Sequence, residues 1–171
     1  MKNFIPVLAL FVFIVVSGCS EPQDVMLKKI NDLEEQENFL GAIKAIETFL
    51  TDYPESEYSA EMLARLANLY ESTEKDYHKA IALHQELIRR FPDSRYSVQA
   101  RFMIGYIYAN DIKDYDNARK AYNEFLELYP DDELTPSVKW ELENLGKDLS
   151  EIPLFKETSA RESTEKNSLK E

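Results

Sequence analysis

The chain has 171 residues, of which 20 are basic and 32 acidic, so its formal net charge at pH 7 is −12. This length suits one modest domain, and 44% hydrophobic residues are enough to build a core. An acidic surface is repelled by nucleic-acid phosphates and by anionic lipid headgroups. We therefore expect no nucleic-acid partner, and any attachment to a membrane must come from another feature.

Residues 1–18 have the pattern of a secretory signal peptide. Lys2 gives a positive start, and an unbroken apolar run of thirteen residues follows at 4–16. As a helix this run would span roughly 20 Å, which is short of a hydrocarbon core about 30 Å thick. The pattern therefore predicts a cleaved signal peptide and not a membrane span.

The apolar run ends in Val16-Ser17-Gly18-Cys19. This ending resembles the lipobox of bacterial lipoproteins, and the resemblance implies cleavage before Cys19 and acylation of Cys19, with palmitate as an expected chain. An ordinary signal peptide with an incidental cysteine is the alternative. Cys19 is the only cysteine, so lipidation would leave no thiol for a disulfide, a metal or a nucleophile. By the sorting rule of such lipoproteins in enteric bacteria, Ser20 after the cysteine, and not Asp, implies the outer membrane, on its periplasmic face.

A short tether is expected at 19–23, and beyond it the chain repeats with a period of 38 residues. Each unit contains a polar–aromatic pair, an alanine and an aromatic–proline pair at equivalent positions. They are Asn38-Phe39, Asp76-Tyr77 and Asp114-Tyr115; Ala42, Ala80 and Ala118; and Tyr53-Pro54, Phe91-Pro92 and Tyr129-Pro130. Such a period indicates a solenoid, in which each unit buries its apolar face against its neighbours.

Each unit is predicted to contain two helices. The polar residue of the first pair (Asn38, Asp76 or Asp114) predicts an N-cap, because its side-chain oxygen can accept amide N–H groups of the first turn. Apolar residues then recur at helical spacing until the proline ends the helix. In the preceding helices, Ala67 and Gly105 are small where two helices must approach closely.

Both ends of the array depart from the repeat. The segment 24–36 is helical in character but degenerate, as suits an N-terminal cap. Thr135 and Pro136 predict an N-cap and a first helical residue. A C-terminal capping helix is expected from four apolar residues: Val138, Leu142, Leu145 and Leu149. We expect the repeat domain to cover 24–152, and a charged, disordered tail to cover 153–171.

In the third unit, Ile104-Gly105-x-x-Tyr108 is followed by Tyr115-x-x-Ala118-x-x-x-Tyr122 and Pro130. This pattern resembles the tetratricopeptide repeat, which implies an all-α, right-handed superhelical solenoid of about three helix pairs plus the capping helix. The family's unit has about 34 residues. Here one extra residue lies between the paired helices (109–114) and three lie after the proline (92–97). The longer connection resembles outer-membrane assembly lipoproteins of the BamD type and the Tol-Pal partner CpoB.

The sequence contains no recognisable catalytic constellation. His78 and His84 lie six positions apart on one predicted helix and so point in different directions. His84 takes the place of Ile46 and Tyr122 in the sister units, which predicts a partly buried packing residue. No phosphate-binding loop, serine elbow or zinc-ligand set is present. We therefore expect no enzyme, no cofactor and no metal site; a hydrolase with paired carboxylates is the alternative.

In tetratricopeptide arrays the first helix of each pair lines a concave groove that holds partner segments. By this resemblance the expected groove residues are Glu61, Ala64, Asn68, Glu71, Gln99, Phe102, Tyr106, Asn110, Trp140 and Asn144. Phe102, Tyr106 and Trp140 would form an aromatic row suited to anchoring partner side chains. The alternative is that Phe102 and Trp140 only pack the end of the solenoid. The family's carboxylate clamp needs Lys and Arg where Gln99 and Met103 stand, so that mode of recognition is not expected.

These features predict a lipid-anchored protein–protein interaction scaffold of the bacterial envelope, most like a component of an outer-membrane protein assembly complex. A periplasmic coordinator of the Tol-Pal or peptidoglycan machinery is the second interpretation. The expected partners are envelope proteins or peptide segments in the groove, and the membrane that receives the lipid on Cys19.

Overall fold

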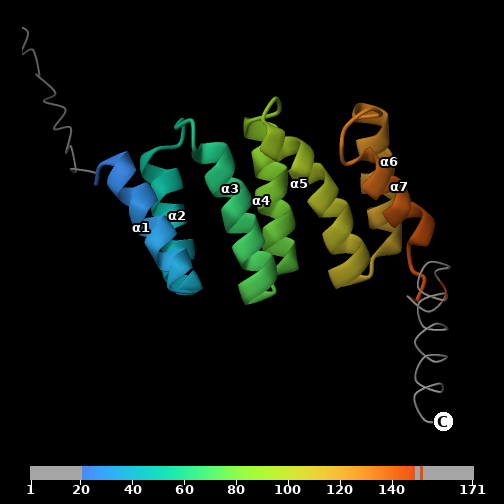
Figure 1. Ribbon diagram of the computed structural model, residues 1–171, viewed down its shortest axis with the longest axis horizontal. Coiled ribbons are helices and arrows are strands. Elements are labelled where there is room, and N and C mark those ends of the chain that lie inside the picture. Colours follow the sequence, from blue (N-terminus) through green and yellow to red (C-terminus); the bar gives the residue numbers. More distant parts are fainter. Residues whose placement is uncertain (1–20, 149–150, 152–171) are drawn as a thin grey trace, which may run out of the picture.

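The computed structural model describes residues 21–148 and residue 151. The predicted signal peptide, Cys19 and the predicted tail lie outside the described residues and stay predictions. The described helices stand in a row, and each contacts the next in sequence (Figure 1). They are α1 (Gln23–Glu35), α2 (Phe39–Asp52), α3 (Ser59–Leu69), α4 (Tyr77–Arg90), α5 (Arg95–Tyr106), α6 (Tyr115–Leu128) and α7 (Thr135–Asn144). No strand occurs in this part of the chain, so the predicted all-α solenoid is confirmed.

The second helix of each pair begins directly after the residue that was predicted to cap it. Asn38, Asp76 and Asp114 each accept a hydrogen bond from the backbone N–H three residues on, at 3.1, 3.0 and 3.1 Å. The residue before each cap is left-handed, with φ of 56°, 55° and 64° at Glu37, Lys75 and Lys113. This conformation reverses the chain between two antiparallel helices.

The extra residue between paired helices is absorbed in a π-helical turn. Such turns cover Tyr70–Glu74 after α3 and Ile107–Ile112 after α5. Each is closed by the N–H of the next cap residue, which donates to Tyr70 or Tyr108 at 3.0 or 2.8 Å. A π-turn adds one residue within a helix, so the insertion lengthens the last helical turn and not the loop.

The connection after each proline is held by a buried hydroxyl. The carbonyl of the aromatic residue before the proline accepts a hydrogen bond from Ser59, Ser97 or Thr135, six residues on, at 2.8, 2.6 and 2.7 Å. All three hydroxyl residues are buried. The prediction that Thr135 is an N-cap was wrong: Leu134 holds that position and Thr135 lies in α7. Its hydroxyl is bonded to the Tyr129 carbonyl and so does not cap the helix.

The core runs along the row as three groups of buried side chains. The largest joins α1 to α5 and includes Ile30 and Phe49. A small group joins α4 to the second π-turn, and the third surrounds Tyr122 and Phe125. Gly105 is confirmed as a point of close approach, because a Cβ there would lie 2.5 Å from the Tyr122 ring.

The capping helix is shorter than predicted. α7 ends at Asn144, and Leu145 lies beyond it with φ −55° and ψ 118°, followed by Gly146 at φ 78°. Leu145 still packs against the C-terminal core group, as does Leu142. The apolar residues were therefore correctly predicted to pack in the core, but Leu145 does so from the turn that follows α7. Leu149 lies outside the described residues.

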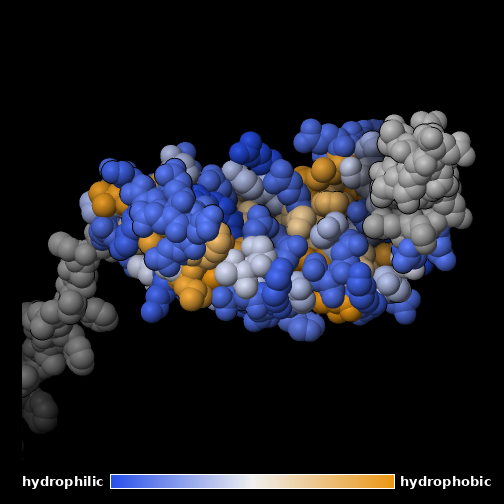
Figure 2. Space-filling view, turned by 60° about the horizontal axis from the view of Figure 1, so that its bottom comes forward, coloured by the Kyte–Doolittle hydropathy of each residue, from blue (hydrophilic) through white to orange (hydrophobic). Residues whose placement is uncertain are grey.

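The molecular surface is mixed. The face drawn in Figure 2 is mostly hydrophilic, and hydrophobic side chains show through it in separate patches. The exposed large hydrophobic residues of the described chain are Val25, Phe39, Leu40, Tyr58, Tyr115, Leu128 and Trp140. None of the described helices has the length and apolar character needed to cross a membrane.

Candidate functional site

Two neighbouring depressions, which both include Phe102, form the candidate site. The α3–α5 depression has a volume of about 400 Å³ and the α5–α7 depression about 440 Å³. The first is lined by Ala64, Asn68, Glu71, Ser72, His84, Tyr96, Gln99, Ala100, Phe102, Met103 and Leu134. The second is lined by Phe102, Pro136, Ser137, Trp140 and Glu141. We call the two together the groove.

Most of the predicted groove residues line these depressions. Asn68, Glu71, Gln99 and Phe102 lie in the first, and Trp140 lies in the second with Phe102. The Tyr106 ring lies beside Phe102, with 6.1 Å between ring centroids. Asn110, Asn144 and Trp140 share a smaller hollow of about 100 Å³ at the C-terminal end.

The aromatic residues of the groove differ in burial. Phe102 packs against the C-terminal core group, and its ring centroid is 6.2 Å from that of Tyr122. Trp140, in contrast, is 39% exposed. Packing therefore accounts for part of the Phe102 surface, whereas the Trp140 indole is open to solvent.

Three carboxylates act electrostatically on Tyr106. Burial raises the pKa of Tyr106, and the charges of Glu141, Asp111 and Glu71 raise it further. Burial also raises the pKa of Glu71, with Asp111 adding to the effect and Lys75 opposing it. Burial raises the pKa of Glu141 as well, and a hydrogen bond from Asn110 opposes that shift. Neither Glu71 nor Glu141 forms a salt bridge among the described residues, so both carboxylates have lost hydration without gaining an ion pair.

His84 lines the α3–α5 depression from α4. It is 2% exposed, and so more deeply buried than predicted. Neither ring nitrogen has a hydrogen-bond partner within the described residues. Burial lowers the pKa of His84 to about 4, so the imidazole is neutral at pH 7.

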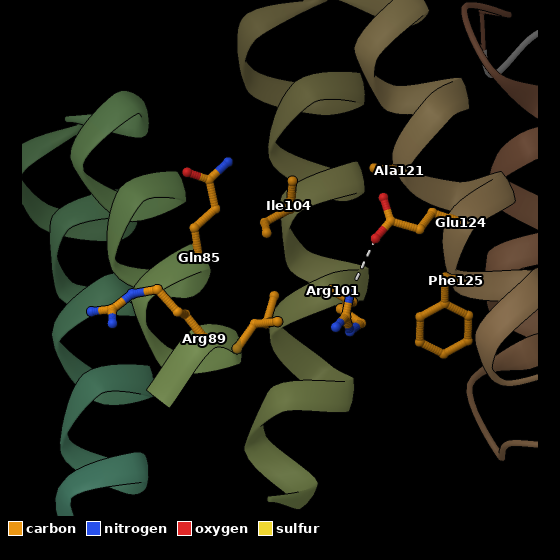
Figure 3. A pocket seen from close by; sticks show the side chains of 8 residues that line it. Gln85, Arg89, Arg101, Ile104, Ala121, Glu124 and Phe125 are labelled. Atoms are coloured by element: carbon orange, nitrogen blue, oxygen red, sulfur yellow. Dashed lines mark hydrogen bonds and ion pairs between the residues drawn. The ribbon is translucent and has the colours of Figure 1, made fainter. Parts of the chain in front are cut away.

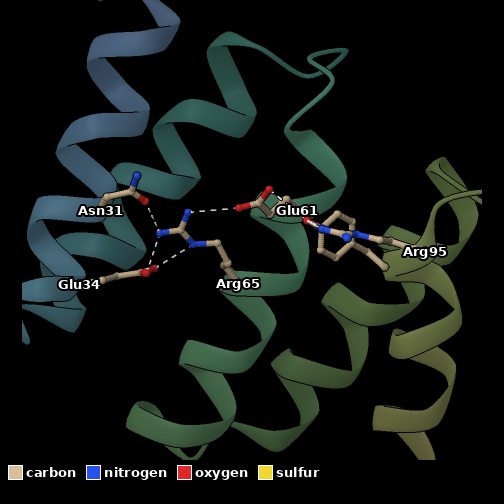
Figure 4. Close-up of polar contacts among 6 residues, drawn as sticks. Asn31, Glu34, Glu61, Arg65 and Arg95 are labelled. Atoms are coloured by element: carbon tan, nitrogen blue, oxygen red, sulfur yellow. Dashed lines mark hydrogen bonds and ion pairs between the residues drawn. The ribbon is translucent and has the colours of Figure 1, made fainter. Parts of the chain in front are cut away.

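Glu61 faces a different environment from the other predicted residues. Arg65 makes hydrogen bonds of 2.6 and 3.2 Å to the Glu34 carboxylate and of 2.8 Å to Asn31, and its third contact is an ion pair of 3.5 Å with Glu61 (Figure 4). The Tyr96 hydroxyl also donates to Glu61, at 3.1 Å. This network links α1, α3 and α5. Sequence reasoning missed it, although the spacing of four between Glu61 and Arg65 was a signal for an ion pair.

A further pocket lies on the other face of α5, between α4 and α6 (Figure 3). Arg101 and Ile104 line it, and both are on the opposite side of the helix from Gln99 and Phe102. It has a volume of about 270 Å³, and its lining mixes apolar side chains such as Phe125 with polar and charged ones. Arg101 is paired there with Glu124 at 3.1 Å. The sequence did not predict this pocket, because it depends on the spacing of three helices.

No group of His, Cys, Asp and Glu side chains within residues 21–148 could hold a metal ion. The stacked helix pairs and the groove across their first helices define a helical-repeat protein. Two family models, both described as tetratricopeptide repeat, match residues 27–95 and 99–132, and the comparison with curated proteins gives no significant match. The chain belongs to the tetratricopeptide-repeat proteins. These repeats indicate a protein–protein interaction scaffold, and such proteins are typically non-catalytic.

Proposed function

We propose that this protein is a lipid-anchored scaffold of the bacterial envelope that holds a partner protein in the groove. The observation that supports this most directly is the pair of depressions that share Phe102. They combine an exposed indole with the side-chain amides of Asn68 and Gln99, a mixture suited to anchoring a partner side chain and satisfying its backbone.

The lipid anchor is supported by the sequence Val16-Ser17-Gly18-Cys19. α1 begins at Gln23, and a tether of four residues reaches about 14 Å at most. A lipid on Cys19 would therefore hold the first helix pair close to the membrane surface. Ser20 supports the outer membrane, on its periplasmic face, as the location.

A role in an outer-membrane protein assembly complex is supported by the 38-residue unit with its longer connection after the proline. That connection, with its serine or threonine hydroxyl bonded to the carbonyl before the proline, occurs in all three units. The resemblance to assembly lipoproteins rests on this segment. The alternative is a coordinator of the Tol-Pal or peptidoglycan machinery, whose repeats it also resembles.

Crosslinking in native membranes, followed by capture of the full-length protein, tests the groove. Wild type should recover a defined envelope partner, and the double variant Phe102→Ala/Trp140→Ala should recover about tenfold less, because hot-spot aromatics dominate binding. Leu128→Ala is the matched control, since Leu128 is an exposed hydrophobic residue on α6 outside the groove. Undiminished recovery by a folded double variant would refute the groove role. Capture of Tol-Pal proteins would favour the alternative.

The anchor is tested separately with Cys19→Ser. The wild-type protein should fractionate with the outer membrane, and mass spectrometry should show an acylated Cys19 at the mature N-terminus. The variant should lose both properties, because serine cannot form the thioether. A mature protein with an unmodified Cys19 would show that the cysteine is incidental.

A further inference from the structure

We infer that the groove binds a positively charged segment, with a lysine or arginine side chain held between Glu71 and Glu141 beside the Tyr106 and Phe102 rings. This inference rests on the proposed function, because it names the chemistry of the partner held in the same groove.

The first argument is the state of the groove carboxylates. Glu71 lines the α3–α5 depression and Glu141 the α5–α7 depression, and both act electrostatically on Tyr106, as does Asp111. None of the three forms a salt bridge within the described residues. Glu34 of α1 and Glu61 of α3 are instead paired with Arg65. One set of acidic side chains is therefore used by the fold, and the other set is left without a close cation.

The neighbouring lysines do not fill this role. Lys75 acts on Glu71 only at a distance that gives no ion pair, and Lys113 and Lys147 line the small hollow beside Glu141. The Lys147 ammonium group donates a hydrogen bond of 3.4 Å to the Asn144 side-chain oxygen, and not to Glu141. An oxygen of Asp111 is moreover buried without a hydrogen-bond partner. Glu141 accepts a hydrogen bond from Asn110, but a neutral donor does not replace a cation beside a half-buried carboxylate.

The second, independent argument is His84. It is 2% exposed, lines the same depression as Glu71, and has no partner at either ring nitrogen. A neutral imidazole presents one nitrogen that accepts hydrogen bonds. The depression that Glu71 lines therefore also holds a buried acceptor without a donor, which a cationic guest would supply and an acceptor-only guest would not. An anionic guest would instead meet the Glu71 carboxylate.

The aromatic residues fit the same occupant. Phe102 and Tyr106 lie with ring centroids 6.1 Å apart, and Trp140 is open to solvent in the adjoining depression. Aromatic faces attract ammonium and guanidinium groups, and tryptophan does so most strongly. Carboxylates beside aromatic faces therefore favour a cationic side chain over a neutral one.

Trp140 provides the readout, because it is the only tryptophan of the chain. The mature full-length protein in mild detergent would be titrated at low salt with hexa-arginine amide and with hexa-citrulline amide, which has nearly the same shape but no side-chain charge. Hexa-arginine should change the Trp140 fluorescence saturably, with an affinity at least about tenfold above that of hexa-citrulline. Glu71→Gln and Glu141→Gln should each weaken hexa-arginine binding about three- to tenfold.

Glu127→Gln is the matched control, since Glu127 is an exposed carboxylate of α6 outside the groove. It removes the same charge and should leave the affinity unchanged. Equal binding of hexa-citrulline, or equal weakening by Glu127→Gln, would overturn the inference, because either result means general attraction to an acidic protein. The cellular capture experiment separates the two proposals. A partner lost in Phe102→Ala/Trp140→Ala but retained in Glu71→Gln/Glu141→Gln would refute the cationic guest and leave the groove function standing.

Discussion

His84 and Tyr122 occupy equivalent positions in successive repeats, and both are buried. Tyr122 lies against Gly105, where a Cβ would come within 2.5 Å of its ring. In the second unit the equivalents of this pair are His84 and Ala67, where a smaller ring accompanies a larger neighbour. These two units therefore keep a similar combined volume for the pair while they vary its two members.

This volume rule gives a prediction for Gly105→Ala. The added methyl must displace the Tyr122 ring, so we expect the free energy of unfolding to fall by about 1–3 kcal/mol. Urea unfolding followed by circular dichroism measures the loss. Adding Tyr122→His reproduces the Ala67/His84 pair of the second unit and should restore part of the stability. A double variant that is no more stable than Gly105→Ala alone would show that the pair does not set the fit.

The buried imidazole predicts an acid-sensitive stability. Burial lowers the pKa of His84 from 6.5 to about 4, so between these pH values the unfolded chain binds a proton that the folded chain does not. Stability is therefore fully present above pH 6.5 and is lost as the pH falls toward 4, with about 2–3 kcal/mol lost at pH 4.5.

Urea unfolding at pH 7 and pH 4.5 measures this loss, and His84→Leu is the comparison. Glu71 and Glu141 have raised pKa values, so their contribution has the opposite sign and is present in both proteins. The difference between wild type and His84→Leu isolates the imidazole. The same drop in both proteins would assign the acid sensitivity to another group.

At the scale of elements, the array is held by contacts between neighbouring helices. A polar network centred on Arg65 also joins α1, α3 and α5, the first helix of each pair. Arg65 on α3 joins the Glu34 carboxylate of α1 through two hydrogen bonds, and it is only partly exposed. Two parallel N–H···O bonds to a carboxylate fix direction as well as distance. The network therefore sets how α1 lies on α3.

Arg65→Ala should loosen α1 while it leaves the C-terminal helices intact. We expect a loss of about 1–3 kcal/mol, because charge-assisted hydrogen bonds at a partly buried site are removed. Hydrogen exchange should quicken in α1 and α2 but not in α6. Arg119→Ala, at an exposed position of α6, is the control. Unchanged exchange in α1 would mean that apolar packing alone positions the first helix.

At the scale of the whole molecule, the core is a line of buried groups and not a single centre. In such arrays each unit is stabilised by itself and by its neighbours. Damage at one end should then remain near that end. Such local stability suits a scaffold, because a change in structure caused by a partner at one end would not spread to the other end.

Paired truncations at the two ends test this behaviour. Ile30→Ala in α1 and Val138→Ala in α7 each remove a fully buried side chain, which for an isoleucine costs about 2–5 kcal/mol. The first should raise hydrogen exchange mainly in α1 and α2, and the second mainly in α6 and α7. A uniform loss of protection along the chain in either variant would show that the array unfolds as one unit.

Much of the fold could be predicted from equivalent positions in the sequence. The caps at Asn38, Asp76 and Asp114 were correct, because capping depends on residues three apart in the chain. The role of Thr135 was wrong, since its hydroxyl is bonded to a carbonyl six residues earlier across a turn. Ser59, Ser97 and Thr135 are separated by the same period of 38 residues, so the repeat indicated a shared role for their hydroxyl groups. The sequence did not show that the acceptor is the carbonyl before the proline.

The helices, their pairing and the face that lines the groove could be read from the amino-acid sequence, because they follow from local propensity and from a regular period. Which acidic residues are already paired depends on the tertiary structure. Glu61 is engaged by Arg65 and Tyr96, whereas Glu71 and Glu141 have no salt bridge among the described residues. The tertiary structure also placed Glu71 and the unpartnered His84 of α4 in the same depression. Burial and charge at the groove depend on distances between helices, which no pattern along one chain specifies.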